Sequence, residues 1–420
     1  MGADGDGVGA LADGTPVYVP LSLPGELVDA WPVAPRGDGW AAVANDVPEP
    51  SADRVEPPCP HFGACGGCSL QHWRGDSYLT WKVGLLRDAL RRAGFDGFDV
   101  AEIVQTPPRA RRRLDLAARH VPAGMVLGLH RPRSKEVVDL ADCHVLDPAL
   151  TALIAPLRAM LARLQGLRRE ASVVANLLDN GPDLLLRTDA ELTLADRTAL
   201  TAFARAHGLP RVAWALGDDT PEPVCVLRPP TVTLSGVPVS PPPGAFLQAS
   251  VAGEAAIVAA VLAALPRKLP ARAWIAEFYA GCGAFSFALA ERARVAAWEG
   301  DAAAVKALRT AANQAGLSGR LGATQRDLAR QPLAAPELAG CAAVVLDPPF
   351  AGTPAQMPAI AATKPAVVVY VSCNPAALTR DARVLREAGY RVASAIPIDQ
   401  FLWSARLESV VSFVRALNRP

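Results

Sequence analysis

The strongest constraint in this 420-residue sequence is an alternation of apolar strand-like and helical segments that starts near residue 246. Strand-like segments recur at 274–279, 295–298, 322–327, 342–347, 366–371, 391–396 and 409–414, and helices separate most of them. Apolar strands that alternate with helices are typical of a parallel sheet with both faces covered. We therefore predict an α/β fold with a doubly wound, Rossmann-like domain over residues 244–420.

The rest of the chain is long enough for one or two further domains. Its apolar runs fall short of the about 18 residues that a membrane-spanning helix needs. The N-terminus is acidic and glycine-rich and has no apolar segment of the signal-peptide kind. We expect a cytoplasmic, monomeric protein without a membrane partner.

Two smaller domains are predicted ahead of the C-terminal one. Short strands punctuated by glycine and proline over residues 1–50 indicate a small OB-like β-barrel. Residues 59–230 indicate a mixed α/β domain. Its expected elements are helices at 75–94, 146–167 and 194–206, strands at 114–119, 125–130 and 212–216, and a hairpin over 173–187 that turns at Asn180-Gly181.

Three closely spaced cysteines mark the start of the central domain. Cys59, Cys65 and Cys68 form a CxxxxxCxxC pattern, and Gly66 and Gly67 allow a tight wrap. Thiolates in such an array are typical metal or cluster ligands, and Cys143 is the best fourth ligand. Four cysteines suit zinc or an iron–sulfur cluster equally, and the spacing does not choose between them.

The charge of the chain is unevenly distributed. Residues 1–56 carry ten acidic and two basic side chains, whereas residues 82–135 carry five acidic and twelve basic ones. A basic segment of this density suits a polyanion such as RNA, although a solvated arginine-rich face is the plain alternative. The predicted RNA-binding residues are Arg109, Arg111, Arg112 and Arg113.

A cofactor site is predicted at the first strand of the C-terminal domain. That strand opens into Gly281-x-Gly283, Glu299 follows the second strand, and Asp327 follows the third. Glycines let the backbone approach a ligand, and an acidic group after the second strand can accept from ribose hydroxyls. Ser286 stands where a dinucleotide fold needs a third glycine, so the pattern favours S-adenosylmethionine over NAD.

A candidate nucleophile follows a later strand. Cys373 lies in Val371-Ser372-Cys373-Asn374-Pro375, at the carboxyl end of an apolar strand, where ligands gather in open α/β sheets. Asp347, in Leu346-Asp347-Pro348-Pro349-Phe350, ends the strand before it. A buried cysteine that fills an apolar site is the alternative.

Together these motifs resemble the RNA uracil-5-methyltransferase family. The resemblance rests on residues 246–250 (FLQAS), 278–285 (FYAGCGAF), 346–349 (LDPP), 371–375 (VSCNP) and 407–410 (LESV), in the order of the family, and extends to the four cysteines and the glycine-rich N-terminus. The layout looks most like that of the 23S ribosomal RNA enzymes, which implies a TRAM-type N-terminal barrel and an unpaired RNA loop as target.

The resemblance implies roles for individual residues. Cys373 would be the nucleophile and Glu408 the general base. Cys59, Cys65, Cys68 and Cys143 would hold a [4Fe–4S] cluster. The cofactor S-adenosylmethionine would contact Gln248, Tyr279, Gly281, Gly283, Glu299, Asp327 and Asp347. The chain has Ser250 and Phe350 where the family usually has asparagine and arginine.

The reaction requires this pair of side chains. Carbon 5 of uracil is a poor nucleophile until a thiolate adds to carbon 6, and a base must then remove the carbon-5 proton. Two alternatives stay open. Asp347-Pro-Pro-Phe350 is also typical of methyltransferases that act on exocyclic base amines, and a non-catalytic RNA-binding protein with structural zinc would need no intact cofactor loop.

Overall fold

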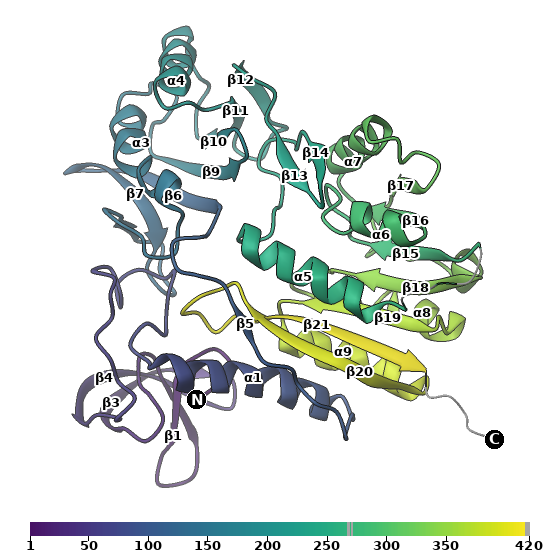
Figure 1. Ribbon diagram of the computed structural model, residues 1–420. Helices are drawn as coiled ribbons and strands as arrows, with labels where there is room; N and C mark the ends of the chain where they lie inside the picture. Colours follow the sequence, from purple (N-terminus) through teal and green to yellow (C-terminus); the bar gives the residue numbers. More distant parts are fainter. Residues whose placement is uncertain (267–268, 270–271, 416–420) are drawn as a thin grey trace.

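The computed structural model describes residues 1–266, 269 and 272–415 (Figure 1). The chain forms a small N-terminal sheet, a central sheet and a large C-terminal sheet. In Figure 1 the N-terminal sheet lies at the lower left, the central sheet at the upper left and the C-terminal sheet at the right. No helix of the described residues has the length and apolar character that a membrane span requires.

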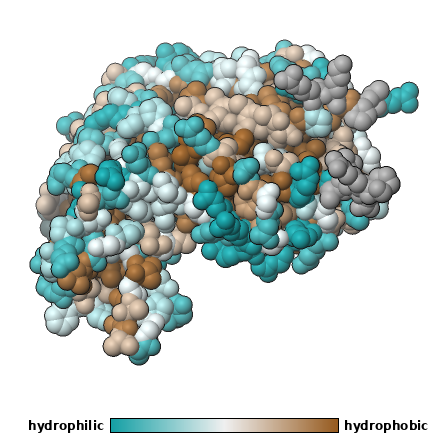
Figure 2. Space-filling model, turned by 60° about the horizontal axis from the view of Figure 1, so that its bottom comes forward, coloured by the Kyte–Doolittle hydropathy of each residue, from teal (hydrophilic) through white to brown (hydrophobic). Residues whose placement is uncertain are grey.

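The N-terminal part is a four-stranded sheet of order β1-β2-β4-β3. Its strands are β1 Gly7–Ala10, β2 Pro16–Val19, β3 Leu27–Arg36 and β4 Gly39–Glu49. The predicted β character is confirmed, but β1 and β3 are sheet edges, so the closed OB-like barrel is not confirmed. Apolar side chains of this sheet, including Trp31 and Val43, are exposed, and brown atoms mark this projecting part at the lower left of Figure 2.

The central sheet has seven strands in the order β12-β11-β10-β9-β6-β7-β8. They are β6 Arg113–Val121, β7 Gly124–His130, β8 Val137–Asp139, β9 Glu170–Leu178, β10 Gly181–Thr188, β11 Arg211–Leu216 and β12 Glu222–Val226. The predicted hairpin is confirmed as β9 and β10. Its turn comes one residue early, because Gly181, with a φ of 124°, already pairs with Leu178.

Helices α2 Pro148–Thr151, α3 Ile154–Leu161 and α4 Leu194–Ala206 belong to the same domain. α4 has the predicted bounds, and Thr193 and Asp196 form a capping box at its start. The single helix predicted over 146–167 is wrong, because the chain forms two short helices there. Pro156 has no N–H to bond the carbonyl of Ala152, which explains the break between them.

The C-terminal sheet has the order β17-β16-β15-β18-β19-β21-β20-β5. Its strands are β15 Trp274–Phe278, β16 Arg294–Glu299, β17 Leu321–Gln325, β18 Cys341–Leu346, β19 Val367–Ser372, β20 Tyr390–Asp399, β21 Glu408–Arg415 and the two-residue β5 Val104–Gln105. The five strands from β15 to β19 are parallel to one another, as predicted. β21 is antiparallel to both neighbours, because the short link from Asp399 to Glu408 leaves no room for a crossover helix.

Helices cover both faces of this sheet. One face packs on α5 Val251–Ala264, α6 Ser286–Arg292 and α7 Ala302–Gln314, and the other on α8 Met357–Thr363, α9 Pro375–Glu387 and α1 Gly75–Arg92. Val345 faces the first group, whereas Val344 and Leu346 face the second. This two-sided burial explains why the strands are apolar at every position.

The second face includes a helix that the sequence analysis assigned to the central domain. Leu86 and Leu90 of α1 are buried in the core of the C-terminal sheet, and Thr379 of α9 donates to the carbonyl of Ala89 at 3.0 Å. β5, which follows α1, pairs with β20. Residues 75–105 therefore pack with the C-terminal sheet, beside α9 and β20. Between the central and C-terminal domains, β13 Val232–Leu234 and β14 Val237–Val239 form a hairpin. The last five residues of the predicted C-terminal domain lie outside the described part.

Arg112 joins the central sheet to α5. Its guanidinium contacts the Glu254 carboxylate at 2.5 Å and donates to the carbonyl of Gln248 at 3.0 Å. Its own carbonyl accepts from the amide of Leu177 in β9 at 2.7 Å. With 4% exposure it offers no surface to RNA, so the structure does not support its predicted RNA contact.

The variant Arg112→Met should lower the free energy of unfolding by about 3–5 kcal/mol, because it leaves the Glu254 carboxylate buried without its partner. The double variant Arg112→Met/Glu254→Leu should recover most of this loss, since no charge then stays buried. Urea unfolding curves measure both effects. Unchanged stability in the single variant would contradict the structural role of Arg112.

A carboxyl without a partner lies in β15. Glu277 is fully buried, neither of its oxygens has a hydrogen-bond partner among the described residues, and burial raises its pKa to about 8. In the unfolded chain this carboxyl ionises near 4.5. The folded state therefore holds a proton that the unfolded state releases, and stability should fall as pH rises between these two values.

Replacing Glu277 by glutamine should remove this part of the pH dependence, because the amide stays neutral at every pH. Relative to the wild type, Glu277→Gln should gain stability between about pH 5 and about pH 8 and show no further gain above it. Urea midpoints across this range measure the difference. A gap between the two proteins that is independent of pH would show that the folded protein does not hold this proton.

Candidate active site

The carboxyl ends of β15, β16, β18 and β19 meet at one edge of the C-terminal sheet. They carry the glycine loop that starts at Tyr279, then Glu299, Asp347 and Cys373. The parallel strand order accounts for this convergence, because parallel strands direct all their carboxyl ends to the same edge. The sequence-predicted residues of the C-terminal domain therefore lie in one region.

Glu299 is hydrogen-bonded to the glycine loop. Its carboxylate accepts from the amides of Gly281 and Asp301, each at 2.8 Å. Gly283, with a φ of 104°, leaves no room for a side chain, because a Cβ there would lie 2.6 Å from Leu308. The loop therefore has one backbone path, and Glu299 keeps spare lone pairs for a ligand.

A cavity of about 450 Å³ lies beside this loop. Tyr279, Glu299 and Asp327 line it, so three predicted cofactor residues share one space. The Tyr279 hydroxyl is 2.7 Å from that of Thr353, and the Asp327 carboxylate accepts from the amides of Ala329 and Arg330. Acidic side chains at the rim suit the hydroxyl groups of a ribose.

Cys373 and Glu408 lie next to each other across two strands. Ser372 of β19 pairs with Ser409 of β21, so in this antiparallel register Cys373 comes opposite Glu408. Burial, together with the negative charges of Glu408 and Asp347, raises the pKa of the Cys373 thiol to about 12. Burial and the charge of Asp347 also raise the pKa of Glu408. In this state the thiol holds its proton.

Two glutamines connect the carboxylates of Asp347 and Glu408, and we call Gln248 and Gln400 the amide bridge. The Gln248 side-chain amide donates to Asp347 at 3.0 Å. The Gln400 amide donates to Gln248 at 2.9 Å and to Glu408 at 2.8 Å. The second carboxylate oxygen of Glu408 has no partner among the described residues. Sequence reasoning missed Gln400, and a glutamine directly after the β20 strand was its only local signal.

The two departures from the family pattern have distinct structural roles. Ser250 caps α5, because its hydroxyl accepts from the amide of Gly253 at 3.0 Å. Phe350 is 48% exposed, and the guanidinium of Arg406 lies 4.2 Å from the centre of its ring. Its carbonyl accepts from the side chain of Asn374, next to Cys373, at 2.8 Å. Phe350 and Arg406 therefore lie close to the candidate nucleophile.

The four cysteines that were predicted as metal or cluster ligands surround one cavity of the central region. They line one cavity of about 660 Å³, and the residues concerned, which we call the cysteine array, are Cys59, Cys65, Cys68 and Cys143. A Cβ on Gly66 would come within 2.6 Å of the His130 carbonyl, so this wrap requires glycine there. Among the residues that the structure describes, no three His, Cys, Asp or Glu side chains are close enough to hold one metal ion.

The predicted RNA-binding arginines differ in their surroundings. Arg109 pairs with Asp142 at 3.0 Å, and Arg111 donates to the carbonyl of Arg113 at 2.9 Å. The Arg113 guanidinium lies 5.5 Å from the ring centre of Phe246, which is 64% exposed. Arg111 and Arg113 line the same cavity as the cysteine array.

Comparisons with known proteins agree with this arrangement. Residues 323–416 match the family model described as tRNA (uracil-5-)-methyltransferase. An RNA methyltransferase of uncharacterised function from Brucella suis biovar 1 (strain 1330) is 39% identical over 98% of this chain and 95% of its own. The 23S rRNA (uracil(1939)-C(5))-methyltransferase RlmD of Pectobacterium atrosepticum is 35% identical over 98% of this chain and 91% of its own.

The fold is similar to that of a solved structure. The tRNA (uracil-54, C5)-methyltransferase of Pyrococcus abyssi, in complex with S-adenosyl-L-homocysteine, superposes with a TM-score of 0.72 at 22% identity, over 98% of both chains. At that identity the likeness concerns the fold alone. The two full-length sequence relatives, the family model and the residues gathered at the strand ends together show that this chain belongs to the RNA uracil-5-methyltransferase family.

Proposed function

We propose that this protein transfers the methyl group of S-adenosylmethionine to carbon 5 of a uridine in RNA through a covalent bond to Cys373. The placement of Cys373 opposite Glu408 carries this proposal, and the cavity lined by Tyr279, Glu299 and Asp327 at the same edge of the sheet supports it. One nucleophile and one base within reach of the same small ring are what the reaction needs.

Each residue has a separate duty in the reaction. The Cys373 thiolate adds to carbon 6 and forms a carbon–sulfur bond, which makes carbon 5 nucleophilic. The bound S-adenosylmethionine supplies an electrophilic methyl group. After carbon 5 has taken that methyl group, Glu408 accepts the carbon-5 proton, and the returning electron pair expels the thiolate. Glu408 must be ionised for this last step, although its burial opposes that state.

The cofactor would occupy the cavity beside the glycine loop. Glu299 and Asp327 would receive its hydroxyl groups, while Tyr279 and the tight path at Gly281 and Gly283 would shape the wall. Gln248 and Asp347 do not line this cavity and would face the reactive end of the cofactor, because their hydrogen bond continues to Glu408 through Gln400.

Ribosomal RNA is the substrate class that we propose, because the Pectobacterium relative, which acts on 23S rRNA, aligns over nearly the whole chain. Arg111 and Arg113 lie beside the exposed ring of Phe246 and would contact phosphates near an unpaired loop. The target base must leave any stack to reach Cys373. Arg109, tied to Asp142, would contribute at the edge of this surface.

The two catalytic variants should fail at different steps. Cys373→Ala should bind RNA but form no covalent complex and no 5-methyluridine. Glu408→Gln should add the thiol and transfer the methyl group, and then accumulate a covalent protein–RNA complex, because proton removal typically contributes about 10²–10⁴-fold to a rate. Denaturing gels and nucleoside mass spectrometry measure the complex and the product.

A methyltransferase that acts on an exocyclic amine would give the opposite pattern. It needs neither a thiol nor Glu408, so Cys373→Ala would retain methylation and no variant would attach to RNA. Such a result would discard the proposed reaction and move attention to Asp347 and Phe350. Cys341→Ala, which removes a buried cysteine at the far end of β18, is the matched control and should retain activity.

We also propose that the cysteine array holds a [4Fe–4S] cluster. A four-iron cluster takes four thiolate ligands, and the four cysteines of the array line one cavity. The charges of Cys143, Cys65 and Cys59 add to the effect of burial, which raises the pKa of Cys68 to about 12. Without a metal these groups therefore hold their protons, and a positively charged centre would favour the thiolate form in which they bind it.

Protein purified without oxygen should be brown and contain iron and sulfide, and Cys143→Ser should lose both together with some stability, because cluster binding is coupled to folding. Absorption spectra and metal analysis measure the content. Cys225→Ser, in β12 of the same domain, is the control and should keep the colour. Stoichiometric zinc without iron would contradict the proposal.

A further inference from the structure

A buried polar network behind the catalytic base suggests how that base is held. We propose that Gln400 is a positioning residue for Glu408, and that the buried ion pair of Lys82 and Asp399 fixes Gln400 in place. This inference rests on the proposed role of Glu408 as general base. It assigns a part in the reaction to α1, a helix more than three hundred residues earlier in the chain.

Gln400 has every polar atom of its side chain in use. Its amide nitrogen donates to Glu408 at 2.8 Å and to Gln248 at 2.9 Å, and its oxygen accepts from the amide of Ala249 at 3.1 Å. The side chain is 3% exposed, so water offers no replacement. A turned amide would set its oxygen against two acceptors, and therefore only one orientation fits.

This orientation leaves one oxygen of Glu408 free. Gln400 occupies Oε2, whereas Oε1 is buried and has no partner among the described residues. An unpaired buried acceptor lowers the stability of the fold, and its presence in a native structure calls for an explanation such as a catalytic role. Oε1 is thus the atom that would take the carbon-5 proton, and Gln400 sets the direction in which it points.

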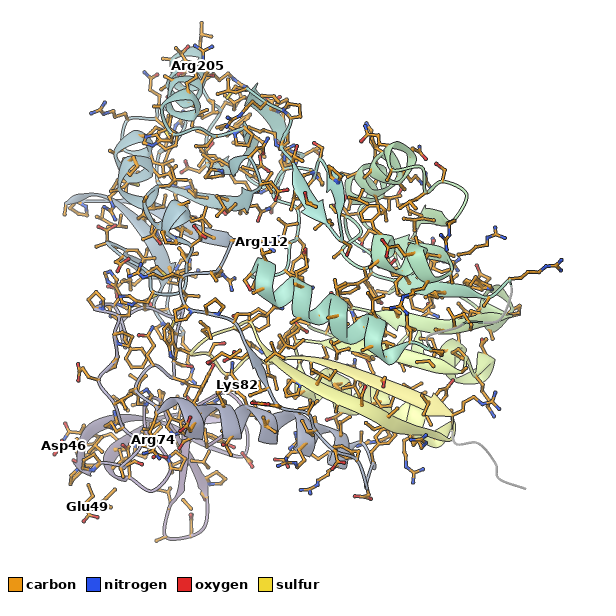
Figure 3. The ribbon with its side chains drawn as sticks, viewed as in Figure 1. Asp46, Glu49, Arg74, Lys82, Arg112 and Arg205 are labelled. Atoms are coloured by element: carbon orange, nitrogen blue, oxygen red, sulfur yellow. The ribbon has the colours of Figure 1, made fainter. Side chains whose placement is uncertain are left out.

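Lys82 contacts both chain neighbours of Gln400, the side chain of Asp399 and the backbone of Phe401. Its ammonium lies 2.5 Å from the Asp399 carboxylate and 3.0 Å from the carbonyl of Phe401. Both charged side chains have no solvent exposure. Figure 3 shows Lys82 on α1, where this helix passes the end of β20. The ion pair therefore fixes the residue before Gln400 and the one after it.

Two further contacts complete this support. The Tyr78 hydroxyl donates to the Asp399 carboxylate at 2.8 Å and accepts from the amide of Trp403 at 2.9 Å. The amide and the hydroxyl of Thr106 both donate to the Asp399 carbonyl at 3.1 Å. Residues of α1 and of the segment after β5 thus hold the loop that carries Gln400.

The hydrogen bond from Gln400 also affects the proton on Glu408. Burial and the charge of Asp347 raise the pKa of Glu408, and the Gln400 bond opposes this rise. The Cys373 thiol, directly after β19, also faces Glu408. Arg112, beyond Gln248, is paired with Glu254. Without Gln400, fewer Glu408 carboxyls would be ionised at a given pH.

The variant Gln400→Met keeps the volume and removes the three hydrogen bonds. We expect kcat to fall roughly 10- to 100-fold with the KM for RNA nearly unchanged, because the loss falls on proton removal. The acid limb of the kcat–pH profile should move to higher pH, since the pKa of Glu408 rises when its donor is lost. The covalent protein–RNA complex should decay more slowly than in the wild type.

Gln356→Met is the matched control for a lost buried amide. Gln356 has no exposure, and its side chain bonds only the backbone of Leu333. The control should lose stability as Gln400→Met does but keep the position of the pH profile. A pH profile that shifts equally in both variants would reduce Gln400 to a structural residue.

Gly253→Ala tests the position of Gln400 without removing a polar group. A Cβ on Gly253 would come within 2.8 Å of the Gln400 oxygen and 3.0 Å of its Cβ. Alanine favours a helix by about 1 kcal/mol over glycine, so the variant should fold. It should nevertheless slow the decay of the covalent complex, and wild-type decay in it would contradict the required placement of Gln400.

The ion pair is tested by a double variant, because a single change would leave a buried charge and destabilise the fold. Lys82→Met/Asp399→Leu should fold, slow the decay of the complex roughly tenfold and shift the pH profile as Gln400→Met does. Arg211→Met/Asp183→Leu removes another buried pair, in the central domain, and should leave decay unchanged.

The outcomes separate this inference from the proposed reaction. If Glu408→Gln accumulates no covalent complex, the role of Glu408 fails and the inference fails with it. If Glu408→Gln traps the complex but Gln400→Met and the Lys82/Asp399 double variant decay at the wild-type rate, only the positioning role is wrong. Slow decay in all three supports both.

Discussion

The buried ion pair of Lys82 and Asp399 joins two segments that lie 317 residues apart in the chain, the helix α1 and the end of β20. A lysine ammonium without solvent is stable only when its partner and its remaining hydrogen bonds are well placed, and here Asp399 and the Phe401 carbonyl satisfy it. Burial lowers the pKa of Lys82 to about 8 although the Asp399 carboxylate opposes this shift, so the ammonium keeps its proton at neutral pH. The ion pair therefore joins the helix α1 to the end of β20.

Hydrogen bonds of 2.8 to 3.0 Å connect the residue after Asp399 to the proposed catalytic residues. Gln400 follows Asp399 in the chain, and its side chain bonds Glu408 on one side and Gln248, which bonds Asp347, on the other. The surrounding strands are apolar, so these bonds act in a medium of low dielectric constant, where they are strong and an unpaired group is expensive. Two carboxylates so placed raise each other's pKa unless a positive charge arrives between them.

Local patterns predicted the parts of the fold that local contacts make. The bounds of α4 follow from its capping box, and the apolar strands from 274 to 414 follow from burial on both faces. Antiparallel β21 and the broken helix at Pro156 were missed, although a short link and a proline explain them. In the active region the sequence indicated Cys373, Glu408 and the glycine loop.

The missed residues share one property, which is that their partners are distant in the sequence. Arg112 contacts Glu254, and Lys82 contacts Asp399 across 317 residues. A cluster of arginines suggests contact with RNA, and an apolar helix suggests packing in the nearest domain. Neither pattern carries information on which distant residues the side chains contact. Charge density predicted a surface at Arg113, which the exposed ring of Phe246 supports, but not the buried position of Arg112.

The same electrostatics restrain the nucleophile. Burial and two neighbouring carboxylates keep the Cys373 thiol protonated, with a pKa near 12, and a protonated thiol reacts neither with oxidants nor with an idle methyl donor. Under the proposed reaction, the sulfonium of S-adenosylmethionine would bring a positive charge to this negative pocket. That charge would favour ionised Asp347 and Glu408 and a thiolate at Cys373 together. The Cys373 thiol would thus become reactive only in the complex with S-adenosylmethionine, in which the methyl donor is already bound.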